Sequence, residues 1–186
     1  MVTKNYARFS AGFQDHTGNG VIANIKIKNI EGVIDGIQMA NQAVANDTLF
    51  TYTPAMFART GLRSFPMEKT NQVYSNSGMF FGSGTTPATE EDYKLENLIG
   101  FSDAGLSVVS TNLAHIVNDN TLYVYTYTVQ NNSSEPITIS ESALISSIYY
   151  YAQNKVITFV WARDTFEPVT LEPGETRPFT MTIGLE

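Results

Sequence analysis

The segment 79–99, MFFGSGTTPATEEDYKLENLI, has the order of a phosphate-binding loop: an apolar start, a glycine-rich turn and an acidic, helix-like stretch. A nucleotide-binding loop needs a lysine and a hydroxyl residue directly after its last glycine. Here Gly84 is followed by Thr85, Thr86 and Pro87, and Pro87 also stands where a dinucleotide fingerprint has its third glycine. The acidic residues 90–92 would repel phosphate. We therefore reject phosphate binding and expect Thr89 to cap a short helix whose acidic first turn complements the helix dipole.

Residues 15–20, DHTGNG, resemble the first half of a calcium-binding loop, with oxygen-bearing side chains at alternate positions and a glycine at the sixth. The closing bidentate glutamate would fall at position 26, which is Lys26. A glycine-rich surface turn is the better interpretation. The chain has no cysteine, and its two histidines, His16 and His115, show no metal-ligand spacing. The sequence thus predicts no metal and no cofactor.

A serine nucleophile is the next candidate, because GFSDAG (100–105) resembles a nucleophile elbow around Ser102. The glycine expected after the serine is replaced by Ala104, and His115 is the only histidine downstream. The acid between that serine and that histidine, Asp103, is too local to complete a triad. We therefore disfavour a serine hydrolase.

Two further arrangements stay open. Glu141, Asp164 and Glu167 could converge as the carboxylate pair of a sugar hydrolase, although such residues are more often surface charges. The tyrosines of LYVYTYTVQ (122–130) and IYYY (148–151) could form a glycan-stacking platform. Cross-strand packing or a protein interface is the favoured interpretation of these tyrosines.

Composition limits the partners. The chain has 186 residues, a formal net charge of −7 and eleven scattered Lys and Arg residues. A field of that sign repels phosphate backbones and anionic lipid surfaces, so neither nucleic acid nor a membrane is an expected partner. The first residues lack the apolar core of a signal peptide, so we expect synthesis in the cytoplasm, with release only in a larger assembly or by lysis.

The elements expected to position these residues are mainly strands. LYVYTYTVQ has the strongest alternation, with Tyr123, Tyr125, Tyr127 and Val129 on one face. A helix is predicted from Asn29, its cap, because Ile30, Val33, Ile34, Ile37 and Val44 recur at helical spacing. Further strands are expected at 21–30, 49–53, 106–111, 137–140, 142–151, 156–166, 168–171 and 179–185. The pattern predicts one domain over 1–186, a mainly β, antiparallel, jelly-roll-like sandwich with one or two short helices in its N-terminal half and residues 1–20 as an arm or loop.

Three segments resemble virion proteins of tailed bacteriophages. GSGTTPATEEDYKLE (82–96) is similar to a segment of the type Gly-x-Gly-Thr-Thr-x-x-x-Thr-x-x-Asp-Tyr-x-Leu-Glu. NNSSEPITISESALI (131–145) and ARDTFEPVTLEPGETRPFTMTIGL (162–185) are similar to the C-terminal strands of the same proteins, where an Arg-Asp strand precedes a Pro-Gly-Glu turn. Residues 1–78 carry no part of the resemblance.

The resemblance implies a structural component of the virion, not an enzyme, with no catalytic residues. It fits a capsid-associated accessory or decoration protein, or a neck or tail component. Its partners would be other virion proteins and copies of itself, and edge strands and the N-terminal residues are the expected docking elements. A receptor- or glycan-binding module on the virion surface is the alternative. In this picture Gly82 and Gly84 allow a sharp turn, and Tyr93 and Leu95 supply buried contacts.

Overall fold

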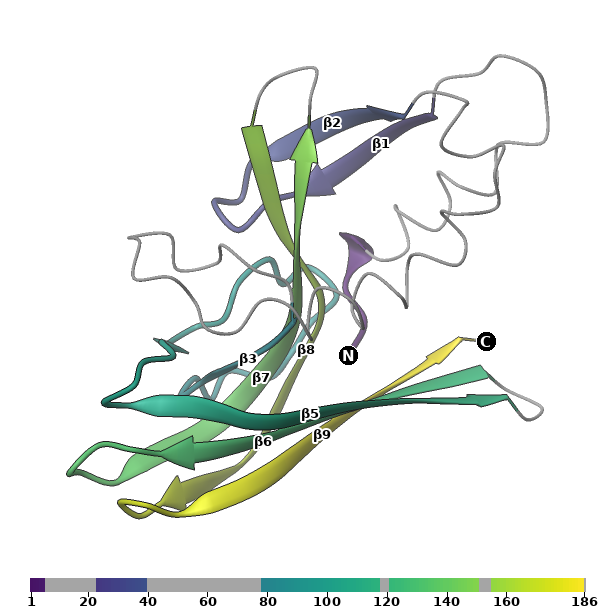
Figure 1. Ribbon diagram of the computed structural model, residues 1–186. Helices are drawn as coiled ribbons and strands as arrows, with labels where there is room; N and C mark the ends of the chain where they lie inside the picture. The colour runs from purple at the N-terminus through teal and green to yellow at the C-terminus, as the bar shows by residue number, and fades with distance from the viewer. Residues whose placement is uncertain (6–22, 40–77, 118–120, 151–154, 186) are drawn as a thin grey trace.

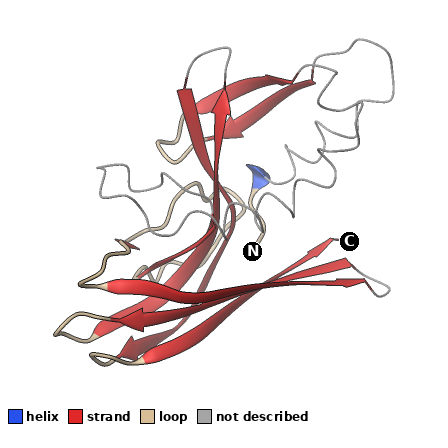
Figure 2. Ribbon diagram, viewed as in Figure 1, coloured by secondary structure: helices blue, strands red, loops and turns tan. Residues whose placement is uncertain are grey.

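The computed structural model describes residues 1–5, 23–39, 78–117, 121–150 and 155–185, and these are almost entirely strand (Figures 1 and 2). The strands are β1 (Ala23–Lys28), β2 (Ile34–Met39), β3 (Gly78–Gly82), β4 (Leu98–Ile99), β5 (Leu106–Val117), β6 (Thr121–Asn131), β7 (Ile137–Tyr150), β8 (Lys155–Leu171) and β9 (Thr176–Leu185). All of their pairings are antiparallel. The prediction of a mainly β, antiparallel protein is confirmed.

Two of the sheets face each other as a sandwich. One has the strand order β4-β3-β7-β8 and the other β5-β6-β9, while β1 and β2 pair separately. Figure 1 shows the β7–β8 hairpin passing behind the three-stranded sheet and extending toward β1 and β2. With four and three strands in the described part, the facing sheets do not confirm the jelly-roll form, which has eight strands.

The main core lies between the two sheets. Met79 and Phe81 of β3, with Phe159 and Trp161 of β8, come from one side and are buried. The other sheet contributes these buried side chains: Leu106, Tyr125, Tyr127, Val129, Met181 and Ile183. Their spacing of two along each strand follows from the alternation of side chains across a sheet. The faces predicted for the strands at 122–130 and 179–185 are therefore confirmed where their side chains are described.

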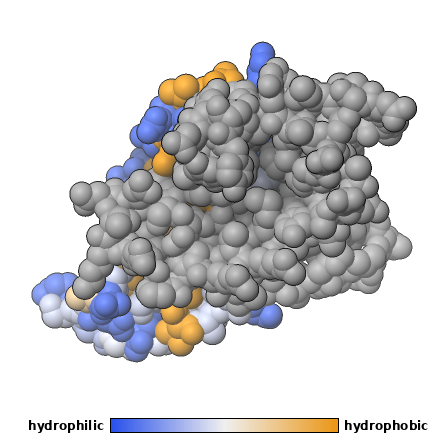
Figure 3. Space-filling view, turned by 45° about the horizontal axis from the view of Figure 1, so that its top comes forward, coloured by the Kyte–Doolittle hydropathy of each residue, from blue (hydrophilic) through white to orange (hydrophobic). Residues whose placement is uncertain are grey.

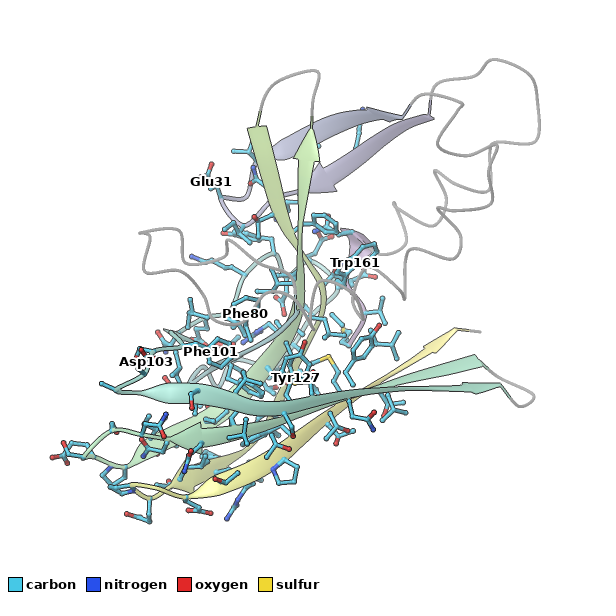
Figure 4. All side chains as sticks on the ribbon, in the orientation of Figure 1. Glu31, Phe80, Phe101, Asp103, Tyr127 and Trp161 are labelled. Carbon is cyan, nitrogen blue, oxygen red and sulfur yellow. The ribbon has the colours of Figure 1, made fainter. Side chains whose placement is uncertain are left out.

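The outer face of the four-stranded sheet is covered by chain. Residues 83–97, here called the cover segment, connect β3 to β4. A second cluster of buried residues lies beneath it: Phe80, Leu95, Ala143, Ile145 and Val160. Phe101 packs on it from the edge, with its ring centroid 5.8 Å from that of Phe80 (Figure 4). The sheet is thus buried on both faces over β3 and the middle of β7 and β8, and Leu95 supplies the buried contact expected of it.

The helix predicted from Asn29 is wrong over the described residues 29–39. Asn29 does cap, because its Oδ1 accepts the N–H groups of Glu31 and Val33 at 3.0 Å, but it caps the turn of a hairpin. Gly32, at φ +81°, reverses the chain, and the apolar residues that follow enter β2. Isoleucine and valine fit a strand as well as a helix, so their spacing alone did not decide between the two.

The short helix expected after Thr89 is also a turn. The N–H of Asp92 donates to the carbonyl of Thr89 at 3.2 Å, and the chain then continues without helical structure. In the described part only residues 4 and 5 are helical. Thr89 therefore caps no helix, and it bonds in the opposite sense: its N–H and its hydroxyl both donate to the Asp92 carboxylate at 2.9 Å.

Four expected strands merge into two. The segments 137–140 and 142–151 belong to β7, and the segments 156–166 and 168–171 belong to β8. Pro168 does not end β8, because it lies in an irregularity between the Ile139–Val169 and Glu141–Thr165 pairs. A proline is tolerated at such a bulge, where no ladder N–H is required. The strand expected at 49–53 lies outside the described residues.

The first residues pair with β8. Val2 forms a bridge with Ala162, and the N–H of Thr3 donates to the Trp161 carbonyl at 2.8 Å. Thr3 also donates its hydroxyl to the Val160 carbonyl at 2.7 Å, and Asn5 bonds both backbone groups of Lys28. Residues 1–5 of the predicted arm therefore join the sheet and the β1–β2 hairpin, whereas 6–20 lie outside the described residues.

The outer side of the three-stranded sheet is polar. We call it the threonine face; by register and exposure its described members are Ser107, Ser110, Asn112, Val124, Thr126, Thr128, Gln130, Thr176, Pro178, Thr180 and Thr182. Large exposed apolar side chains are few in the described part: Met1, Val33, Ile34 and Val109. On the side that Figure 3 shows, apolar colour likewise forms small groups among hydrophilic residues.

Candidate functional site

A buried carboxylate is the centre of the polar residues that the fold gathers. Glu141 of β7 has no solvent exposure and points toward the cover segment. Its Oε1 accepts the backbone N–H groups of Gly84 at 3.0 Å and Asn97 at 2.9 Å, and its Oε2 accepts that of Glu96 at 3.1 Å. Three backbone donors converge on one carboxylate because both ends of the cover segment return to the same point.

Arg163 of β8 completes the site from the next strand. Its Nε donates to Glu141 Oε2 at 2.9 Å, and its Nη2 lies 2.8 Å from the same oxygen. The Nη1 group donates to Asp92 Oδ2 at 2.9 Å, and Nη2 also donates to the Thr86 carbonyl at 3.2 Å. One almost fully buried guanidinium thus joins β7, β8 and the middle of the cover segment.

Two glycines make room for this carboxylate. A Cβ on Gly82 would lie 2.3 Å from Glu141 Oε1, and one on Gly84 would lie 2.6 Å from the same atom. Contacts below 3.0 Å force a shift, and Glu141 is fixed by its donors. Neither glycine has a positive φ, so a sharp turn, the expected reason for them, does not explain them. They are required because the backbone approaches the Glu141 carboxylate closely.

The cover segment is also tied to itself. Glu96 Oε2 accepts the backbone N–H groups of Thr85 and Thr86, both at 3.0 Å, and lies 3.8 Å from Arg163 Nη2. Ser140 donates its buried hydroxyl to the Gly84 carbonyl at 2.9 Å. The threonines that follow Gly84 therefore present their backbone donors to a protein carboxylate, where a phosphate-binding loop would present them to a ligand.

These contacts shift the pKa values of two carboxyl groups. Burial works to raise the pKa of Asp92, but the hydrogen bonds from Thr89 and Arg163 together lower it below its ordinary value. The backbone and side-chain hydrogen bonds from Thr86 are the main cause of a lowered pKa at Glu96. Both groups are therefore held as carboxylates beside the Arg163 guanidinium.

The carboxylates considered for sugar hydrolysis do not meet. Glu141 is buried, whereas Asp164 and Glu167 are exposed. Asp164 pairs across the ladder with Ser142, so it lies on the opposite face of the sheet from Glu141. Glu141 also has each oxygen engaged by two or more donors, which leaves no open side for a water molecule.

The serine candidate is separated from its histidine. Ser102 lies in a turn that Gly105 closes by donating its N–H to the Ser102 carbonyl at 3.2 Å. His115 follows in β5, nine residues beyond Leu106, the residue bonded to the Ser102 N–H. At about 3.3 Å per residue that is roughly 30 Å along the strand. Ser102 and His115 therefore cannot form a nucleophile–base pair.

Two of the candidate glycan-stacking tyrosines are in the core. Tyr125 and Tyr127 are 5% and 3% exposed, and Tyr127 lies between the two sheets (Figure 4). Burial raises the pKa of Tyr127, although a hydrogen bond from the Met79 backbone opposes the shift. The ring faces of these two tyrosines are occupied by packing, as the favoured interpretation held. The side chains of Tyr123 and of the run 148–151 lie outside the description.

Within the described ranges, no three His, Asp or Glu side chains gather as metal ligands. The same ranges hold no helix of the length and apolarity needed to cross a membrane. The loop at 15–20, considered above for calcium, lies outside them.

A second buried polar residue joins two turns. Asn131, at the end of β6, donates its amide to the carbonyls of Glu135 at 2.8 Å and Leu171 at 2.9 Å, and its Oδ1 accepts the N–H and hydroxyl of Ser133. Its backbone carbonyl accepts the N–H of Gly174 at 2.7 Å. Asn131 therefore fixes the turn before β7 against the turn before β9.

Sequence reasoning missed Arg163 and Asn131 as organising residues. A signal for Arg163 exists in the sequence, because it directly follows the apolar run VITFVWA (156–162). An arginine that continues a buried strand is expected to have a partner of opposite charge. Glu141 was considered for sugar hydrolysis, whereas the structure places it, fully buried, at the centre of this network.

Protein-family models, curated proteins and solved structures give no match to this chain.

Proposed function

We propose that this protein is a non-enzymatic structural component of a tailed-phage particle, either a capsid-associated accessory protein or a neck or tail part. The observation that carries the proposal is where the three phage-like segments meet. Gly84, Asp92 and Glu96 come from the first segment, Glu141 from the second and Arg163 from the third, and all five share one network. The residues that carry the resemblance are thus those that hold the two strands and the cover segment together.

The chemistry of that network supports a structural role. Its carboxylates are saturated by backbone N–H groups and by one guanidinium, and none of its acidic groups is paired in the way that general acid and base catalysis requires. A buried, fully bonded polar network favours one rigid arrangement of the chain over others. Rigidity of this kind suits a part that must fit into a larger ordered assembly.

The charge of the protein supports the partners we propose. A net charge of −7 keeps separate copies soluble before assembly, and it disfavours binding to DNA or lipid. The partners are therefore other virion proteins and further copies of this chain, in a particle formed inside the host cytoplasm.

The test is antibody–gold labelling of intact particles from the source lysate, viewed by electron microscopy. Labels spread over the head would identify a capsid accessory, and a single cluster at the vertex or tail would identify a neck or tail part. Antibody absorbed with the purified protein is the control. Absence of label on intact particles, together with absence of the protein from denatured particles, would reject the proposal.

The alternative, a glycan-binding module, is tested separately with the purified protein on a glycan array. Burial of Tyr125 and Tyr127 removes two of the stacking surfaces that this alternative relied on. Specific binding on the array would restore it.

A further inference from the structure

We propose that the threonine face is a self-association surface, on which the same face of a second copy of this chain stacks. The first observation is its charge. All eleven of its described members are uncharged, whereas the surface of a soluble domain carries roughly 25–35% Lys, Arg, Glu and Asp. About three charges would be expected on eleven such positions.

The second observation is a bond between hydroxyl groups of neighbouring strands on this face. In the row Asn112–Thr126–Thr180, Thr126 and Thr180 share a hydrogen bond of 3.1 Å between their Oγ1 atoms. Such cross-strand pairs leave short, already bonded side chains that stand at similar heights above the sheet. Two faces of this kind can approach to the spacing of about 10 Å at which stacked sheets pack.

The chemistry of the face excludes other classes of occupant. Its described members include no Lys or Arg to neutralise phosphates, no aromatic ring to stack on a sugar and no carboxylate to hold a cation. What fits it is another uncharged, hydroxyl-bearing protein surface. Within the described residues the threonine face itself is such a surface, and a two-fold pairing requires only that one patch be complementary to itself.

The net charge of the chain points to the same occupant. Two copies that each carry −7 repel one another, and contact through charged faces would bury like charges. Contact through an uncharged face avoids this, so the two copies approach with their charges kept at the periphery. Val109, 56% exposed at the β5 bulge beside Ser110, adds an apolar side chain at the rim.

The size of the face sets the expected strength. Strands of 10–12 residues and three strands across give a sheet of roughly 35 by 14 Å, or about 500 Å² on each copy. A face-to-face pair would bury about 1,000 Å², which is the lower limit for a specific interface. We therefore expect association that is reversible and depends on concentration.

The experiment is sedimentation analysis of the purified full-length chain over a concentration series up to its solubility limit. The unmodified protein is expected to shift from monomer to dimer. Thr180→Lys should raise the dissociation constant at least about tenfold, because the pair would bring two like charges together. The matched control is Thr170→Lys on the other sheet, where Thr170 and Thr138 form an equivalent exposed hydroxyl pair at 2.9 Å, and it should leave the association unchanged.

Asn112→Lys, in the same row as Thr180, serves as a second variant if Thr180→Lys does not fold. Monomer at every concentration, or a dimer that is unaffected by either variant on the threonine face, would overturn the proposal. Loss of the dimer in Thr170→Lys as well would also overturn it, because association would then depend on the other sheet and not specifically on this face. The measurement needs no phage particle, so its outcome is independent of the gold-labelling result.

Discussion

The Glu141 carboxylate and the Arg163 guanidinium contact each other on neighbouring strands, with Arg163 Nε 2.9 Å from Glu141 Oε2, beneath the cover segment. Ala143 pairs with Arg163 across the ladder, so the guanidinium reaches back by one pleat to meet a carboxylate on the same face. Because the pair is buried, substitutions of either residue or of the residues that contact it should change the stability of the fold.

Arg163→Met should be strongly destabilising. It removes one partner of a buried ion pair and leaves Glu141 charged without its cation, a change that costs about 3–5 kcal/mol. The measurement is the free energy of unfolding in urea at neutral pH. Glu167→Gln, which changes an exposed charge on the same strand, is the control and should stay within about 0.5 kcal/mol of the parent. Similar stabilities for the two variants would show that the pair does not hold the fold.

Gly84→Ala should lower stability by roughly 1–3 kcal/mol, because the added methyl group has no room beside Glu141 and Glu96. Gly100→Ala is the matched control, since a Cβ there meets nothing within 4 Å. Thermal unfolding of the two variants beside the parent decides the question. Equal melting temperatures would mean that the cover segment yields to the methyl group.

Stability should fall in acid partly through Asp92. Its folded-state pKa is lowered, so its contribution is present above the unfolded pKa of about 3.9 and is lost as the pH falls below that value toward the folded-state pKa. Urea midpoints measured from pH 7 to pH 3 should therefore decline below about pH 4. The Asp92→Asn variant should show a shallower decline than the parent. Parallel curves for the two proteins would contradict the assignment.

Asn131→Ala should cost about 1–3 kcal/mol, because it leaves the carbonyls of Glu135 and Leu171 without their donor in a buried site. Asn132→Ala, at the neighbouring exposed position with one side-chain bond to Ser107, should change stability by less than about 0.5 kcal/mol. Urea unfolding of both variants gives the comparison. A larger loss in Asn132→Ala would reverse the roles given to the two asparagines.

The strands of the C-terminal half were predictable because their signal is local. At Tyr125, Tyr127, Met181 and Ile183, alternation of apolar and polar residues specifies both the strand and its buried face. The merging of two predicted strands into β8 was not predictable, because Pro168 marks a break in sequence but lies at an irregularity within the sheet.

The N-terminal hairpin shows where local pattern fails. Residues 30–37 satisfy helical spacing, yet the chain reverses at Gly32 and pairs β1 with β2. The Tyr93 ring packs near Gly32 and the Lys28 ammonium lies 4.3 Å from its centroid, so contacts from a distant segment also support the hairpin. Such contacts are invisible in a window of ten residues.

The residue types of the site could be noticed in the sequence, but the contacts between them could not, because those contacts join distant segments. The residue types at Gly82, Gly84 and Glu141 drew notice, but their meaning depends on a contact between positions 57 residues apart, Gly84 and Glu141. Only the folded chain shows that the glycines exist to admit the carboxylate.

The pairing of Thr3 with Trp161 has a consequence for the timing of synthesis. The two residues are 158 positions apart, and ribosomes add about 5–20 residues per second. Thr3 is therefore synthesised roughly ten to thirty seconds before Trp161. Until then the β8 position that receives it does not exist, so this part of the sheet can close only after Trp161 has been added. Thr3 reaches its final place long after it is made.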